Sequence, residues 1–157
     1  MVAESRVLYG IEYSPWTQRA RWALDAKQVA YRYVEYSPML GELGLRFRVR
    51  KLKHARATVP LLVVGDTAIG DSYDIMRYAD DVGVGAPLFQ NADRAEWWRD
   101  QIELALEQMR VRISRKVAQD PQALKEAAAL AVPGFRAGLA SPLAAVGVRF
   151  FANKYDF

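Results

Sequence analysis

The sequence predicts an α/β domain with the element order βαβ-ββα, followed by an all-α domain. Three observations lead to this fold class. Short apolar runs alternate with helical patterns in the first half, a tight turn signal joins two of these runs, and from Pro87 onward the periodic segments have helical spacing. The 157 residues suffice for one compact domain or two small subdomains. We expect the boundary near Gly83 to Phe89, which gives domains of residues 1–83 and 84–157, the second of them short or incomplete.

The first predicted unit is a parallel strand–helix–strand crossover. A continuous apolar run from Val7 to Ile11 is typical of a strand that is buried on both faces. Ser14-Pro15 follows it, and serine as N-cap with proline at the first helical position indicates the start of a helix. Residues 30–36 are rich in aromatic side chains and predict a second strand. The spacing predicts that the buried side of the helix is made of Trp16, Ala20, Ala23 and Leu24.

The second predicted unit is a hairpin followed by a helix. Val59 to Val64 reads as a strand, Gly65-Asp66 as a hairpin turn, and Thr67 to Ile69 as the returning antiparallel strand. Asp71-Ser72 then predicts the cap of a helix from about residue 73 to 81. The expected inward positions of this helix are Ile75, Met76 and Ala79.

A long helix is expected over residues 93–118, and it carries two lines of apolar side chains. The first line is Trp98, Ile102, Ala105, Met109 and Ile113. The second, at seven-residue spacing, is Trp97, Leu104 and Val111, which we expect to be a buried side and one candidate oligomer contact, although it could equally be core. Asp120-Pro121 and Ser141-Pro142 each predict the start of another helix.

Composition excludes several kinds of chemistry. The chain has no cysteine and one histidine, His54, which excludes disulfides, thiolate nucleophiles, cysteine-type zinc sites and multi-histidine metal centres, so no metal is expected. The net charge of +4 favours anionic ligands. The basic run 46–56 is better explained as a solvated helix face beside an anion site than as a nucleic-acid surface. Since no signal peptide or membrane-spanning stretch is evident, we expect a cytoplasmic protein without a membrane partner.

Three short motifs could carry chemistry. Ser14 lies where a helix N-terminus would stabilise an anion, including a thiolate. Val59-Pro60 heads a strand, and a cis bond there would turn the Val59 backbone outward to pair with an extended ligand. Asp71-Ser72 offers a carboxylate and a hydroxyl, which suit a ligand with both an ammonium and a carboxylate group. Each motif also has a structural explanation: an ordinary cap, a trans proline that starts a strand, and another cap.

The order and spacing of these motifs resemble a known family. The segments YSPWTQR, VPLL and IGDSYDIMRYA, between Leu8 and Ala79, resemble landmarks in the thioredoxin-like N-terminal domain of glutathione transferases. The resemblance implies that Ser14 contacts and activates the thiol of glutathione, the co-substrate. It also implies that Val59, before a cis Pro60, pairs with the cysteinyl part, and that Asp71 and Ser72 hold the γ-glutamyl end. A homodimer and an electrophilic small-molecule substrate are implied as partners.

The sequence departs from the family pattern in two places. The family often has Asn-Pro-x-Gly-(Lys/Gln) before the VP pair, where this chain has His54 to Thr58. Thr58 can offer a hydroxyl, but no charge, to the glycyl carboxylate of glutathione. The helical region is also shorter than is usual in the family.

These features lead to two hypotheses about activity. A serine cannot form a mixed disulfide, so the expected activity is activation of the glutathione thiol for attack on an electrophile. Tyr9 and Tyr13 flank the site, and Tyr9 is better explained as core. The alternative is a non-catalytic binding or scaffold protein with the same fold.

Overall fold

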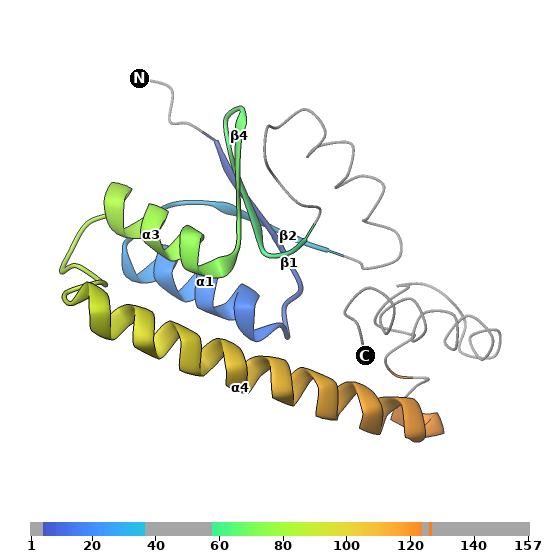
Figure 1. Ribbon diagram of the computed structural model, residues 1–157. Helices are drawn as coiled ribbons and strands as arrows, with labels where there is room; N and C mark the ends of the chain where they lie inside the picture. Colours follow the sequence, from blue (N-terminus) through green and yellow to red (C-terminus); the bar gives the residue numbers. More distant parts are fainter. Residues whose placement is uncertain (1–4, 37–57, 124–125, 127–157) are drawn as a thin grey trace. The chain divides into compact units, whose positions relative to one another are not determined.

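The computed structural model describes residues 5–36, 58–123 and 126. The described part begins with a four-stranded sheet in the order β2-β1-β3-β4. Its strands are β1 (Arg6–Gly10), β2 (Arg32–Glu35), β3 (Leu61–Val64) and β4 (Thr67–Gly70), shown in Figure 1. All four predicted strands are therefore present: β1 is shifted by one residue, β2 and β3 are shorter than predicted, and β4 is one residue longer.

The strand directions agree with the predicted units. β1 and β2 are parallel and are joined through helix α1 (Pro15–Ala26), which confirms the crossover. β3 and β4 are antiparallel across the turn at Gly65-Asp66, which confirms the hairpin. The two units are joined by antiparallel pairing of β1 with β3, in which Leu8 lies opposite Leu62. The result is the α/β fold with the element order expected from the sequence.

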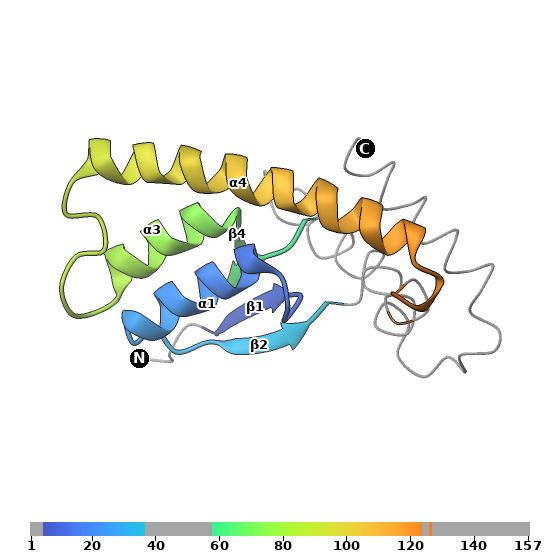
Figure 2. The ribbon, with the colours of Figure 1, turned by 90° about the horizontal axis from the view of Figure 1, so that it is seen from below.

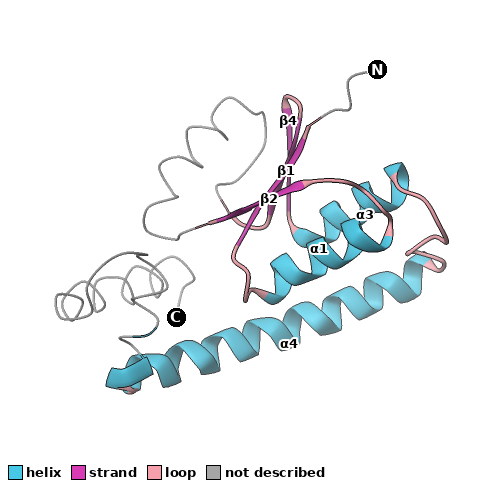
Figure 3. Cartoon of the chain, turned by 180° about the vertical axis from the view of Figure 1, so that it is seen from behind, coloured by secondary structure: helices cyan, strands magenta, loops and turns pink. Residues whose placement is uncertain are grey.

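Two helices cover one face of this sheet. α1 and α3 (Ser72–Val82) lie side by side on it, as Figures 1 and 2 show, and Figure 3 gives the same arrangement from behind. Completely buried side chains from both layers make the core between helices and sheet, among them Leu8, Leu24, Leu62 and Ile75. A second cluster contains Tyr9, Tyr36 and Leu61. Burial of these apolar side chains is the main stabilising contribution to the unit.

The expected inward faces of the two helices are mostly correct. Ala20, Ala23 and Leu24 of α1 and Ile75 and Ala79 of α3 are buried as predicted. Met76 packs against the core but is only partly buried. The prediction was wrong at Trp16, which is half-buried, because the fully buried position on that side of α1 is Thr17.

The long helix α4 (Ala92–Gln119) forms where a helix was predicted, but its apolar lines are not buried. The members Trp98, Ile102, Met109 and Ile113 are 42–56% exposed within the described chain, as are Trp97 and Leu104 at 55% each. Val111 is half-buried. No α4 residue is buried among the described residues, so neither line forms core there, and the oligomer contact stays a prediction.

The described residues fall into two compact units. One contains the sheet, α1, α3 and the beginning of α4 up to Arg99, and the other contains α4 from Asp100 onward. Asp120 accepts hydrogen bonds from the backbone N–H groups of Gln122 and Ala123, as predicted for a helix cap. The helix expected after Ser141-Pro142 lies outside the described residues, and the domain boundary at residues 83 and 84 stays a prediction.

Candidate functional site

The register of the sheet brings the three predicted motifs to one end of it. Leu61, the first residue of β3, pairs with Tyr9 near the end of β1 and with Gly70 at the end of β4. The chain that leaves β1 toward Ser14, the chain that enters β3 through Val59-Pro60, and the chain that leaves β4 into Asp71 therefore all lie at this end. Residues 58–60 are in the middle because β3 lies between β1 and β4.

Ser14 occupies the N-cap position of α1, with an extended backbone (φ −77°, ψ 124°) and Pro15 next to it. Its amide donates to the Ile11 carbonyl at 3.0 Å, and its own carbonyl accepts from Gln18 N at 2.9 Å. The half-buried side chain makes no capping hydrogen bond with the helix. The first turn of α1 therefore combines the positive end of the helix dipole with a hydroxyl that is not used for capping.

Thr17 stabilises the turn before Ser14 through a hydrogen bond. The Thr17 hydroxyl is fully buried and accepts a hydrogen bond from Ile11 N at 3.2 Å. Gly10 leaves room for it, because a Cβ added at Gly10 would clash with the Thr17 side chain. The Gln18 side-chain amide donates to the Glu12 carbonyl and fixes the turn from the other side. The turn that carries Ser14 is therefore fixed by hydrogen bonds from both sides.

The bond between Val59 and Pro60 is cis, as the family resemblance implies. Pro60 is buried, and Val59 is half-buried and packs against the second core cluster. Both residues precede the first β3 residue that pairs with β1. Thr58 is exposed.

Asp71 and Ser72 form the start of α3. Asp71 has a left-handed backbone (φ 66°), and its carboxylate accepts from Tyr73 N at 2.7 Å, which confirms its capping role. Asp71 is exposed, whereas Ser72 is only 1% exposed. The two neighbours therefore differ: one carboxylate at the surface, and one hydroxyl beneath it.

A residue that the sequence reasoning assigned no role lies next to Ser72. Arg19, from α1, donates to the Ser72 hydroxyl from Nε at 3.1 Å and from Nη2 at 2.6 Å. The two residues are 53 positions apart, so spacing gave no reason to connect them. The only available signal was that Arg19 ends the YSPWTQR motif.

Tyr13, next to Ser14, and Tyr33, in β2, both have a raised pKa. Burial and, secondarily, the Glu35 carboxylate raise the pKa of Tyr13 above its ordinary value. Tyr33 donates to Glu35 at 2.6 Å, and burial together with that hydrogen bond raises the pKa of Tyr33 as well. Tyr9 is 8% exposed and belongs to the second core cluster, which confirms that it is core.

Other predicted features fall outside this site. His54 and the basic run 46–56 lie outside the described residues. Within residues 5–36, 58–123 and 126, no group of three or more acidic, histidine or cysteine side chains could hold a metal ion. The helices in the same ranges are too short or too polar to cross a bilayer.

The sheet order, the two helices on one face and the cis-proline at the head of β3 define a thioredoxin-like domain. Residues 8–83 match the sequence family described as the N-terminal domain of glutathione S-transferase. The chain is 30% identical to glutathione S-transferase U13 of Arabidopsis thaliana over 101 residues, which is 61% of this chain and 44% of that protein. It is also 30% identical to glutathione S-transferase U11 of the same plant over 55% of this chain and 35% of that protein.

Solved structures agree on the fold. Glutathione transferase Omega 3C from Trametes versicolor has a TM-score of 0.55 at 19% identity, covering 83% of this chain and 58% of that one. The trimeric glutathione transferase TDR1 of Leishmania has a TM-score of 0.51 at 23% identity, covering 81% and 29%. Residues 8–83 therefore belong to the glutathione S-transferase N-terminal domain family. Its matches span less than half of either Arabidopsis relative.

Proposed function

We propose that the protein is a glutathione transferase that activates the thiol of glutathione for attack on an electrophilic small molecule. The observation that carries the proposal is Ser14 at the N-terminus of α1, with a hydroxyl not used for capping. The match of residues 8–83 to the N-terminal domain of glutathione S-transferase and the meeting of the three motifs at one end of the sheet support it.

Ser14 acts in this proposal by stabilising a sulfur anion. Its O–H donates a hydrogen bond to the glutathione sulfur, while the N-terminus of α1 favours the negative charge. The thiol proton leaves to solvent, the thiolate forms a carbon–sulfur bond to the electrophile, and a leaving group such as halide departs with its electron pair. Each unit by which the thiol pKa falls corresponds to about 1.4 kcal/mol of preference for the thiolate.

The remaining motifs hold the tripeptide. The Val59 backbone, beside the cis Pro60, pairs with the cysteinyl residue. Asp71, with its exposed carboxylate, receives the γ-glutamyl ammonium, and Ser72 receives the adjoining carboxylate. Thr58, which is exposed, offers its hydroxyl to the glycyl carboxylate.

The test compares the native protein with Ser14→Ala, using Ser5→Ala as a matched control. Glutathione binding is followed by tryptophan fluorescence, to which the half-buried Trp16 contributes from two residues beyond Ser14, and turnover is followed with an aryl halide. We expect Ser14→Ala to bind glutathione but to lose turnover by about tenfold or more, as expected for one hydrogen bond to a charged group. Ser5, an exposed residue before β1, should leave both unchanged. Turnover that is the same in all three proteins would exclude the serine mechanism.

A binding or scaffold protein is the second candidate function. The observation that favours it is Thr58, an exposed side chain without charge at the position proposed for the glycyl carboxylate. Glutathione binding without turnover of any electrophile would support this candidate.

A homodimer is proposed as the assembled form. The exposed line on α4, with Trp97 and Leu104 each 55% exposed, supports it, because large apolar side chains in solvent favour association. Light scattering after size exclusion tests the assembly, and Leu104→Glu should shift a dimer toward monomer. A cytoplasmic location is proposed with it.

A further inference from the structure

The contact between α1 and the start of α3 assigns a role to Arg19. The guanidinium donates two hydrogen bonds to a single acceptor, the Ser72 hydroxyl oxygen, at 3.1 and 2.6 Å. Ser72 is 1% exposed, whereas Arg19 is half-buried and so retains contact with solvent. Such a contact is stronger than a hydrogen bond between neutral groups because the donor is charged.

This contact restricts what the Ser72 hydroxyl can recognise. A serine hydroxyl has one hydrogen to donate and two lone pairs to accept with. Because Arg19 supplies donors to the oxygen, the O–H hydrogen is the capacity that remains for a ligand. Ser72 is thereby set as a donor to an acceptor oxygen of the ligand, and the charge of the adjacent guanidinium favours a carboxylate oxygen over the neutral carbonyl oxygen of an amide.

We propose that Arg19 is a positioning residue that makes Ser72 selective for the carboxylate of the γ-glutamyl group. This inference rests on the proposed function and assigns a further residue to it. The guanidinium orients the hydroxyl and places a permanent positive charge beside the incoming carboxylate. The exposed Asp71 carboxylate, next along the chain, repels a carboxylate and attracts an ammonium, so the pair distinguishes the two ends of an amino acid.

The experiment measures selectivity rather than affinity alone. The binding of two probes is compared by tryptophan fluorescence: glutathione, and the glutathione analogue in which the γ-glutamyl α-carboxylate is an amide. The variants are Arg19→Gln, Arg19→Lys and the control Arg21→Gln. Arg21 lies two residues further along α1 and has its guanidinium 4.8 Å from the ring centre of Tyr33 instead.

We expect the native protein and Arg21→Gln to prefer glutathione to the amide by about tenfold or more. Arg19→Gln should bring this ratio close to one, and Arg19→Lys, which keeps a charge but loses the planar fork, should give an intermediate ratio. If the role of Arg19 were purely structural, Arg19→Gln would weaken the binding of both probes equally and leave the ratio unchanged. An unchanged ratio in a folded Arg19→Gln protein overturns the inference and leaves the proposed function standing. Failure of the native protein to bind glutathione at millimolar concentration overturns both.

Discussion

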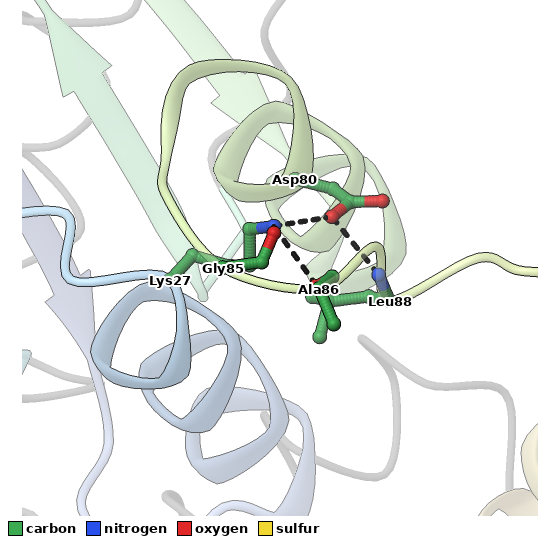
Figure 4. A network of polar contacts seen from close by, with 5 residues as sticks. All are labelled: Lys27, Asp80, Gly85, Ala86 and Leu88. Carbon is green, nitrogen blue, oxygen red and sulfur yellow. Dashed lines mark hydrogen bonds and ion pairs between the residues drawn. The ribbon is translucent and has the colours of Figure 1, made fainter.

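The Nζ atom of Lys27, at the end of α1, lies 2.9 Å from Oδ1 of Asp80 in α3, in an almost fully buried ion pair. Lys27 also donates to the carbonyls of Gly85 and Ala86, at 3.4 and 3.1 Å, and Asp80 accepts from Leu88 N at 2.9 Å (Figure 4). This ion pair therefore connects α1 and α3 with each other and with the segment that follows α3. This ion pair could not be predicted from sequence, since both residues look like ordinary charged positions of surface helices.

We expect Asp80→Asn to lower the free energy of unfolding by about 3 kcal/mol, because the charge of Lys27 stays buried without its partner. The neighbouring Asp81→Asn is the control, since Asp81 is exposed. Chemical denaturation measures both. The double variant Lys27→Met with Asp80→Asn should recover much of the loss. Equal stability of Asp80→Asn and Asp81→Asn would show that the ion pair contributes nothing to the free energy of unfolding.

The same pair should make stability depend on pH. Burial alone would raise the pKa of Asp80, but the hydrogen bond from Leu88 and the ion pair with Lys27 outweigh it and lower the pKa. A lowered folded pKa stabilises the protein above the unfolded value of about 4, and this contribution is lost as pH falls through the folded value. The stability difference between the native protein and Asp80→Asn should therefore be constant from about pH 5 to 7 and shrink below about pH 4. A difference that grows in acid would contradict this assignment.

Gly10→Ala should destabilise the protein by about 1–3 kcal/mol, because the added methyl group meets the buried Thr17 side chain that braces the Ser14 turn. The control is Gly70→Ala in β4, where the nearest atom to the new Cβ, Leu61 Cδ1, is at an ordinary 3.9 Å. Thermal unfolding of the two variants tests the difference. Equal melting temperatures would mean that the Thr17 side chain moves away from the added methyl group at little cost in stability.

Tyr73→Phe should leave stability unchanged or raise it by up to about 1 kcal/mol. Tyr73 is 5% exposed, and its buried hydroxyl has no hydrogen-bond partner among the described residues, so removing the oxygen relieves a desolvation penalty. Its ring keeps its edge contact with Phe89. Tyr78→Phe on the same helix is the contrast: its hydroxyl accepts from Arg6 Nε at 2.7 Å, and its loss should cost about 1 kcal/mol. Denaturation that ranks Tyr73→Phe as the less stable variant would refute this explanation.

Ser14→Cys tests the anion-stabilising position without any ligand. The chain has no cysteine, so the new thiol is the only one that iodoacetamide can alkylate. At the N-terminus of α1 its pKa should fall to about 7 or below, whereas Ser5→Cys should keep a value of about 8.5. The measurement is the alkylation rate of each variant against pH. Identical profiles would show that the helix N-terminus does not favour a sulfur anion.

Much of the fold could be predicted from local pattern, because strands, turns and caps depend on neighbouring residues. Ser14-Pro15 began a helix as expected, and Gly65-Asp66 made the hairpin. The choice between Trp16 and Thr17 could not be predicted, since both fit the helical spacing. Thr17 is the buried residue because its small side chain fits against Gly10 and its hydroxyl accepts a hydrogen bond from the Ile11 amide.

The site was predictable only in part, because local patterns can be read from sequence but contacts between distant residues cannot. Its three motifs were visible in sequence, but the pairing of Leu61 with both Tyr9 and Gly70, which brings them together, is a long-range property of the sheet. The contact of Arg19 with Ser72 likewise depends on how α1 packs beside α3. On α4, helical periodicity predicted the helix correctly, but it could not decide whether the apolar lines would be covered.

The most direct measurement is the pKa of the glutathione thiol while bound, followed through the ultraviolet absorbance of the thiolate during a pH titration. The native protein should lower that pKa by at least about one unit from its ordinary value of about 8.5, and Ser14→Ala should lose most of the shift. A bound thiol that titrates like free glutathione would contradict the account.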